Sequence, residues 1–148
     1  MIKVLFVCVK NSARSQMAEA FLNQLGQPDF IAESAGIEKG TLNPIVVKVM
    51  AEIGYDISNN SVDSVFDFLK QGNQYSLVVK VCDQVNGQRC PVFPNVLKTL
   101  EWNVTDPATL QGSPDEIIEK TRQIRDEIKT RVTNLIAEYR EYAQNRKD

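Results

Sequence analysis

The sequence contains no histidine and only three cysteines among its 148 residues. Without histidine no Ser-His or Cys-His triad can form, and an ordinary zinc or non-haem iron site is disfavoured. Three cysteines cannot all pair with one another, so we do not expect a framework of structural disulfides. In a reducing compartment such cysteines are typically catalytic, redox-active or simply buried.

The sequence also has no long apolar run and no excess of one charge. Its early apolar stretch, residues 4–9, is too short for a membrane span or a signal-peptide core, so we predict a cytoplasmic protein that does not associate with membranes. Seventeen Lys and Arg residues oppose 19 Asp and Glu residues, which gives no general attraction to nucleic acid. A composition of 43% hydrophobic and 24% charged residues is typical of one globular domain, here residues 1–148. Any anionic ligand must therefore be bound locally.

Hydrophobic patterns predict alternating strands and helices. Residues 2–9 form a nearly continuous apolar, β-branched run, which is typical of a strand buried on both faces of a parallel sheet. We also predict strands at 31–34, 76–82 and 96–102, and helices at 13–25, 43–54 and 113–139. Residues 62–69 fit a short helix or a strand. The alternation indicates a single doubly wound α/β domain.

A distinctive motif joins the first strand to the first helix. Cys8 is followed six positions later by Arg14 and then by Ser15, with Val9, Lys10, Asn11, Ser12 and Ala13 between them. In a doubly wound sheet this loop lies where backbone N–H groups and the helix N-terminus attract an anion. Arg14 and Ser15 would favour a Cys8 thiolate, a nucleophile that needs no histidine base. The motif thus predicts a site for a tetrahedral oxyanion such as phosphate or arsenate.

The same residues have simpler interpretations when each is taken alone. Cys8 would be a small core residue, Arg14 a solvated surface charge, and Asp106-Pro107 a turn. Lys10 would either add positive charge beside the anion or point into solvent. The combined spacing and location of Cys8 and Arg14 favour the anion site.

The sequence resembles the low-molecular-weight tyrosine phosphatase fold and, within it, the thioredoxin-coupled arsenate reductases. The resemblance covers most of the chain and is carried by residues 4–8, 11–19, 34–36, 56–58, 82–83, 90–91, 102, 106–108 and 125–128. It implies a four-stranded parallel sheet in the order 2-1-3-4 with helices on both faces. In that order the strand that ends at Cys8 neighbours the strand that ends at Cys82.

The resemblance also implies roles for individual residues. Asp106 would be the general acid that protonates the leaving oxygen. Cys8 would form a thiolate-arsenate adduct, and Cys82 and Cys90 would then form a disulfide that thioredoxin reduces. Asn86-Gly87 is a strong turn signal between Cys82 and Cys90 that would let the two sulfurs meet. These two cysteines are one residue farther apart than is usual in the family.

Two rival functions remain at this point. The first is a phosphatase that hydrolyses phosphate monoesters with Cys8, Arg14 and Asp106; the cysteine pair argues against it, as does Ala108, which stands where the phosphatases usually have an aromatic residue. The second is a non-catalytic module that binds an anion or a phosphopeptide, which the presence of all three catalytic-type residues disfavours.

The resemblance further implies a monovalent cation and no other cofactor. Asn11, Glu19, Ser34 and Asp63 match positions that hold potassium behind the loop in some of the reductases. Their alternative interpretation is loop hydrogen bonding and surface charge. We expect a monomer, and the sequence leaves open whether thioredoxin or a glutathione-type donor supplies the electrons.

Overall fold

The computed structural model describes residues 1–38, 40–82 and 91–145, apart from the side chains of residues 82 and 143–145. The described ranges contain four strands and four α-helices, mixed along the chain as an α/β domain requires. In chain order they are β1 (Ile2–Cys8), α1 (Arg14–Leu25), β2 (Phe30–Gly36), α2 (Pro44–Ala51), α3 (Val65–Lys70), β3 (Leu77–Cys82), β4 (Lys98–Asn103), the 3-10 turn η1 (Pro107–Thr109) and α4 (Pro114–Asn145).

The four strands form one parallel sheet in the order β2-β1-β3-β4, which confirms the predicted topology. Cys8 pairs with Gly36 at the end of β2, and Val7 pairs with Lys80 in β3. Because the strands are parallel, β1 and β3 finish side by side at the same edge of the sheet. The backbones of Cys8 and Cys82 are therefore on neighbouring strands.

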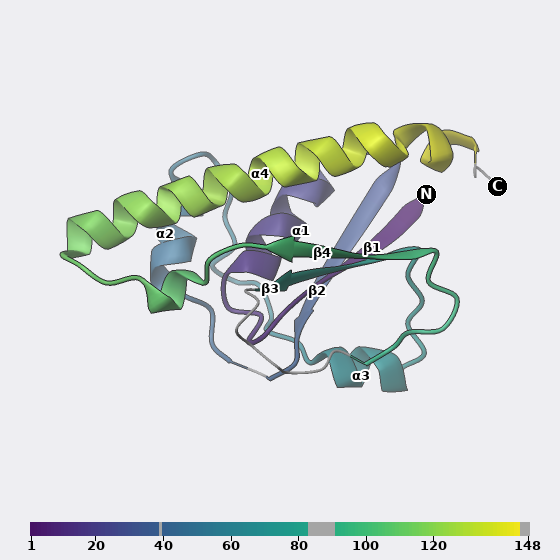
Figure 1. The fold of residues 1–148 in the computed structure, drawn as a ribbon, viewed down its shortest axis with the longest axis horizontal. Helices are drawn as coiled ribbons and strands as arrows, with labels where there is room; N and C mark the ends of the chain where they lie inside the picture. The colour runs from purple at the N-terminus through teal and green to yellow at the C-terminus, as the bar shows by residue number, and fades with distance from the viewer. Residues whose placement is uncertain (39, 83–90, 146–148) are drawn as a thin grey trace.

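Helices cover both faces of the sheet, as predicted (Figure 1). The long helix α4 runs along one face together with α1, while α3 lies on the opposite face. Within β1, Val4 and Phe6 join the core beneath α1 and α4, whereas Leu5 and Val7 pack with Val65 of α3. A strand buried on both faces explains why β1 is apolar at almost every position.

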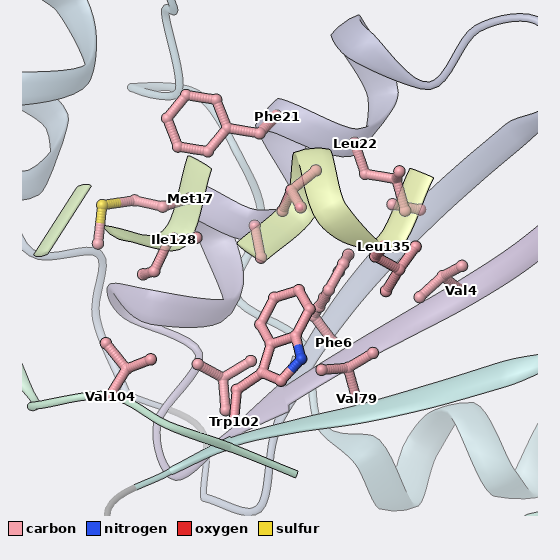
Figure 2. Packing of buried hydrophobic residues seen from close by; sticks show 14 of the residues in the cluster. Val4, Phe6, Met17, Phe21, Leu22, Val79, Trp102, Val104, Ile128 and Leu135 are labelled. Carbon is pink, nitrogen blue, oxygen red and sulfur yellow. The ribbon is translucent and has the colours of Figure 1, made fainter. Parts of the chain in front are cut away.

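The core beneath α4 is built around aromatic side chains from the sheet and from α1. Figure 2 shows the Trp102 indole beside the Phe6 ring, and their centroids are 5.6 Å apart. Phe21 of α1 meets Tyr55 edge-on at 5.1 Å. Trp102 is the only buried residue of β4, which agrees with the prediction that this is an edge strand. The core thus fixes β1 and α1, the two elements that flank the Cys8 loop.

Local signals set the ends of the helices. Residues 62–69 resolve into the helix α3, which begins after Ser64, whose hydroxyl accepts a hydrogen bond from the Phe66 N–H. α2 begins after Asn43 with Pro44 in its first turn and ends at Ala51, three residues before the predicted Gly54. α4 starts at the predicted capping box, where Ser113 and Glu116 exchange hydrogen bonds, and continues past residue 139 to Asn145.

Within the described residues, no helix combines the length and apolar character that a membrane crossing requires.

Candidate active site

The loop between β1 and α1 turns its carbonyl groups outward. All six carbonyl oxygens from Cys8 to Ala13 accept hydrogen bonds, from Ile37 N, Glu38 N, Gly40 N, Gln16 Nε2, Asn43 N and Met17 N in that order. In a trans peptide the carbonyl and the following N–H point to opposite sides. The N–H groups that follow these carbonyls are consequently directed into the hollow of the loop, an arrangement that binds anions.

Close packing against β2 fixes the shape of this loop. A side chain at Gly36 would begin 2.7 Å from the Lys10 carbonyl carbon and 2.8 Å from the Asn11 nitrogen, so glycine is required there. Asn11 has a positive φ of 54°, a left-handed conformation that asparagine tolerates better than most residues. Lys10 is exposed, and its effect on a bound anion stays a prediction.

Cys8 lies at the centre of a buried hydrogen-bond chain. Its sulfur accepts a bond from the Asn11 N–H at 3.1 Å and lies 2.8 Å from the Ser15 hydroxyl oxygen. Ser15 also donates to Asn11 Oδ1 at 2.7 Å. The Ser15 hydroxyl has one proton, and here it is donated to Asn11. A Cys8 thiol therefore donates its own proton to the Ser15 oxygen, whereas for a thiolate the Ser15 hydroxyl can rotate and donate to the sulfur. The site can therefore support either state of the sulfur.

Arg14 is buried, which makes the surface-charge interpretation wrong. Its Nη1 donates to the Val104 carbonyl at 2.9 Å, and its Nη2 lies 3.6 Å from Asp106 Oδ2. The side chain is only 3% exposed. These contacts hold the guanidinium beside the loop, where its remaining donors can meet an oxyanion.

Asp106 is both a turn residue and a neighbour of the loop arginine. Its Oδ1 accepts a hydrogen bond from Ala108 N at 3.0 Å and caps the 3-10 turn, while Oδ2 faces Arg14. The turn and the general-acid interpretations are therefore compatible. Pro107 is buried and anchors the turn, whereas Ala108 is exposed.

The four residues predicted to hold potassium lie together behind the loop. Ser34 lies near enough to Glu19 to lower the pKa of its carboxyl group, and Asn11 Nδ2 donates to the Ser34 carbonyl at 3.5 Å. The pKa of Glu19 is raised from 4.5 to about 7, mainly by burial; Ser34 lowers this pKa, and the carboxylates of Asp63 and Glu33 add to the rise. This is a cluster of oxygen ligands with two acidic groups, Glu19 and Asp63, close together.

The redox cysteines are only partly within the described structure. The backbone of Cys82 ends β3, next to the strand that carries Cys8, as the predicted strand order requires. Cys90 and the predicted Asn86-Gly87 turn lie outside the described residues, so the disulfide stays a prediction.

Comparison with known proteins supports the assignment that the motifs suggest. The family model for low molecular weight phosphotyrosine protein phosphatase matches residues 3–145. The chain belongs to this family. The finding confirms the resemblance drawn from the sequence motifs.

Relatives of this phosphatase-family chain carry a more specific name. This chain is 40% identical over 130 residues to the arsenate reductase of Bacillus subtilis. The match covers 87% of this chain and 91% of the Bacillus protein. A solved structure of an arsenate reductase in the phosphate binding state has a TM-score of 0.75 and 34% identity over 93% of this chain and 98% of the other. The solved structure of the thioredoxin-dependent arsenate reductase of Corynebacterium glutamicum has a TM-score of 0.62 and 25% identity. The match covers 90% of this chain and 62% of the Corynebacterium chain.

The sequence of this phosphatase-family chain predicts the loop and Asp106. It does not predict two groups that hold the loop residues in place by hydrogen bonds. The Val104 carbonyl that holds Arg14 is a backbone group, which no residue type reveals. Gln16 donates to the Asn11 carbonyl, and its only sequence signal is an amide placed directly before the core residues Met17 and Ala18. The Val104 support joins segments 90 positions apart, and Gln16 is itself held by the distant residues Asn60 and Ser61.

Proposed function

We propose that this protein is a cytoplasmic, monomeric arsenate reductase that converts arsenate to arsenite with electrons from thioredoxin. The observation that carries the proposal is the loop around Cys8, whose six outward carbonyls direct N–H groups inward beside the buried Arg14. Relatives 37–40% identical to this chain are named arsenate reductases, and the phosphate-bound state of a related structure supports oxyanion binding by this fold.

Substrate binding depends on charge and donor geometry in the loop. The inward N–H groups of residues 9, 10 and 12–14 and the Arg14 guanidinium together offer donors to several oxygens of one tetrahedral anion. The loop leads into α1, whose N-terminus adds a favourable dipole. The anion would lie over the Cys8 sulfur, which the Asn11 N–H contacts at 3.1 Å.

In the first chemical step, the Cys8 thiolate attacks arsenic(V) and an oxygen departs. Ser15 and the Asn11 N–H support the thiolate before attack. Asp106 gives its proton to the departing oxygen, which leaves as water, and a covalent Cys8 thiol-arsenate adduct remains. The 3.6 Å separation between Asp106 and Arg14 supports this role because it puts the carboxyl group beside the loop.

The second stage transfers two electrons to arsenic. The Cys82 thiolate attacks the Cys8 sulfur, the electron pair of the sulfur-arsenic bond passes to arsenic, and arsenite leaves. Cys90 then attacks Cys82 in the resulting Cys8-Cys82 disulfide and releases Cys8 as a thiolate. A reduced thioredoxin dithiol would convert the Cys82-Cys90 disulfide back to thiols, as the thioredoxin dependence of the Corynebacterium relative suggests.

We also propose that the cluster behind the loop holds a potassium ion. The raised pKa of Glu19 supports a fit, because burial and the nearby Asp63 carboxylate disfavour the ionised form that a cation would stabilise. Glu19, Asp63, Ser34 and Asn11 offer the oxygen atoms that such an ion prefers. A bound ion would supply positive charge that keeps Glu19 ionised and stabilises the Asn11 side of the loop.

One coupled assay tests the proposed function. The protein is mixed with arsenate, thioredoxin, thioredoxin reductase and NADPH, and the oxidation of NADPH is compared with the hydrolysis of an aryl phosphate. We expect sustained NADPH oxidation that requires both arsenate and thioredoxin. Aryl-phosphate hydrolysis without arsenate-dependent NADPH oxidation would favour the phosphatase function over the reductase function. Repeating the assay with glutathione in place of thioredoxin tests the other electron donor.

A further inference from the structure

Gln16, in the first turn of α1, has no role in the mechanism above, although it is completely buried. Its Nε2 group donates to the Asn11 carbonyl at 3.2 Å and to the Ser61 carbonyl at 2.9 Å. Its Oε1 atom accepts from Asn60 Nδ2 at 3.1 Å. Every polar atom of this side chain is thus bonded, and one of the bonds reaches the anion loop directly.

The bond from Gln16 to Asn11 differs from the other bonds that hold the loop. Five of the six outward carbonyls, those of residues 8–10, 12 and 13, accept from backbone N–H groups. The Asn11 carbonyl accepts from a side chain. The orientation of the Asn11-Ser12 peptide therefore depends on a group that a single substitution can remove.

This peptide also follows the loop residue with a positive φ. Asn11 has a left-handed backbone, with a φ of 54°. When its carbonyl points outward to Gln16, the N–H of Ser12 points into the loop. A rotation of the same peptide would turn a carbonyl oxygen toward the anion, replacing a favourable donor with a repulsive acceptor.

We propose that Gln16 is a positioning residue for oxyanion binding: it holds the Asn11-Ser12 peptide so that the Ser12 N–H faces the anion. This inference rests on the proposed function for the identity of the anion. A purely structural role, in which Gln16 only ties α1 to residues 60–61, would change stability but not the affinity of the loop.

The experiment uses Gln16→Met, which keeps a similar side-chain volume but removes all three hydrogen bonds. Inorganic phosphate is the probe: it should protect Cys8 from alkylation by iodoacetamide, which mass spectrometry follows on the Cys8 peptide. Loss of one buried hydrogen bond should raise the phosphate concentration for half-protection about tenfold. In NMR spectra, the shift of the Ser12 amide proton on phosphate addition should shrink.

Two control variants separate positioning from general damage. Asn60→Ala removes the bond to Gln16 Oε1 and leaves the bond to Asn11. Asn23→Ala removes a pair of bonds between α1 and Ala32 of β2, well along the same helix from the loop. Both should lower the thermal midpoint of unfolding while phosphate protects Cys8 as in the wild type.

Gln16→Glu provides a second test with almost unchanged shape, because its carboxyl group cannot donate to both the Asn11 and Ser61 carbonyls. It should also weaken protection by phosphate. Wild-type half-protection and a wild-type Ser12 shift in either Gln16 variant would overturn the inference. Failure of phosphate to protect the wild-type protein would instead contradict the anion site of the proposed function, so the two failures are distinguishable.

Discussion

The loop that holds Cys8 and the turn that holds Asp106 differ sharply in how firmly they are fixed. Each loop carbonyl from Cys8 to Ala13 is hydrogen-bonded, and Cys8 and Arg14 are buried. Asp106 caps a three-residue 3-10 turn, its side chain is 29% exposed, and it reaches Arg14 only at 3.6 Å. The contrast teaches that the loop proposed to bind the anion is fixed by many contacts in the resting structure, whereas Asp106, the proposed acid, is held by fewer of them.

The largest effect should come from Cys8→Ser, which removes the nucleophile from the fixed region. A serine hydroxyl in this loop is not ionised at neutral pH, so arsenate reduction and aryl-phosphate hydrolysis should both fall to background. The fold should persist because Cys8 contributes little volume to the core, and circular dichroism checks this. Arsenate turnover by the folded variant would identify another residue as the nucleophile.

Cys82→Ser and Cys90→Ser should each stop multiple-turnover arsenate reduction but spare aryl-phosphate hydrolysis. Hydrolysis needs only the loop and Asp106, so the two activities should separate. With one equivalent of arsenate, Cys82→Ser should release no arsenite, whereas Cys90→Ser should release one arsenite and stop as a Cys8-Cys82 disulfide. Mass spectrometry distinguishes these states, and sustained turnover by both variants would disprove the relay.

Asp106→Asn, in the less firmly held turn, should have a smaller effect on arsenate reduction, and this effect should be on the rate of the chemical step. Loss of a general acid costs on the order of 100-fold or more in the chemical step. Phosphate affinity should change little, because the loop supplies the binding contacts. Single-turnover adduct formation and phosphate protection of Cys8 measure the two effects, and an unchanged single-turnover rate would remove Asp106 from the mechanism.

The same contrast explains how far the sequence could predict the structure. Strand and helix types followed from long apolar patterns such as residues 2–9, and the loop followed from local spacing between Cys8 and Arg14. The short helix α3 was ambiguous because six residues give too little periodicity. Asn43 and Ser113 stand at helix starts, where their side chains accept hydrogen bonds from backbone N–H groups, so local residue type predicts these two starts well.

The supports of the site escaped prediction because they join distant segments. Arg14 bonds the carbonyl of Val104, 90 positions away, and Gln16 bonds residues 44 and 45 positions away. No local pattern encodes such pairs, since they arise from the packing of α1 against two separate loops. The clustering of Glu19 with Ser34 and Asp63 was expected only from the family resemblance, and the raised pKa of Glu19 could not be derived without its burial.

The smallest effect on activity is expected at Glu19, which lies behind the Cys8 loop. Its contribution is instead a pH dependence of the free energy of unfolding. Burial raises the pKa of Glu19 from 4.5 in a solvated chain to about 7 in the folded one. Between these values the folded state holds a proton that the unfolded state has lost, so the contribution of Glu19 to the free energy of unfolding falls as pH rises from 4.5 and levels off above about 7.

Glu19→Gln should remove this slope, since a neutral amide has no proton to lose. Relative to the wild type, the variant should gain at most about 3 kcal/mol in the free energy of unfolding between pH 5 and pH 8 when choline chloride is the salt. Urea unfolding at both pH values measures the gain. If the variant and the wild type differ in free energy of unfolding by the same amount at pH 5 and pH 8, the raised pKa of Glu19 is contradicted. If the cluster binds potassium as proposed, potassium chloride should stabilise ionised Glu19 and shrink the gain, whereas the variant itself should respond equally to both salts.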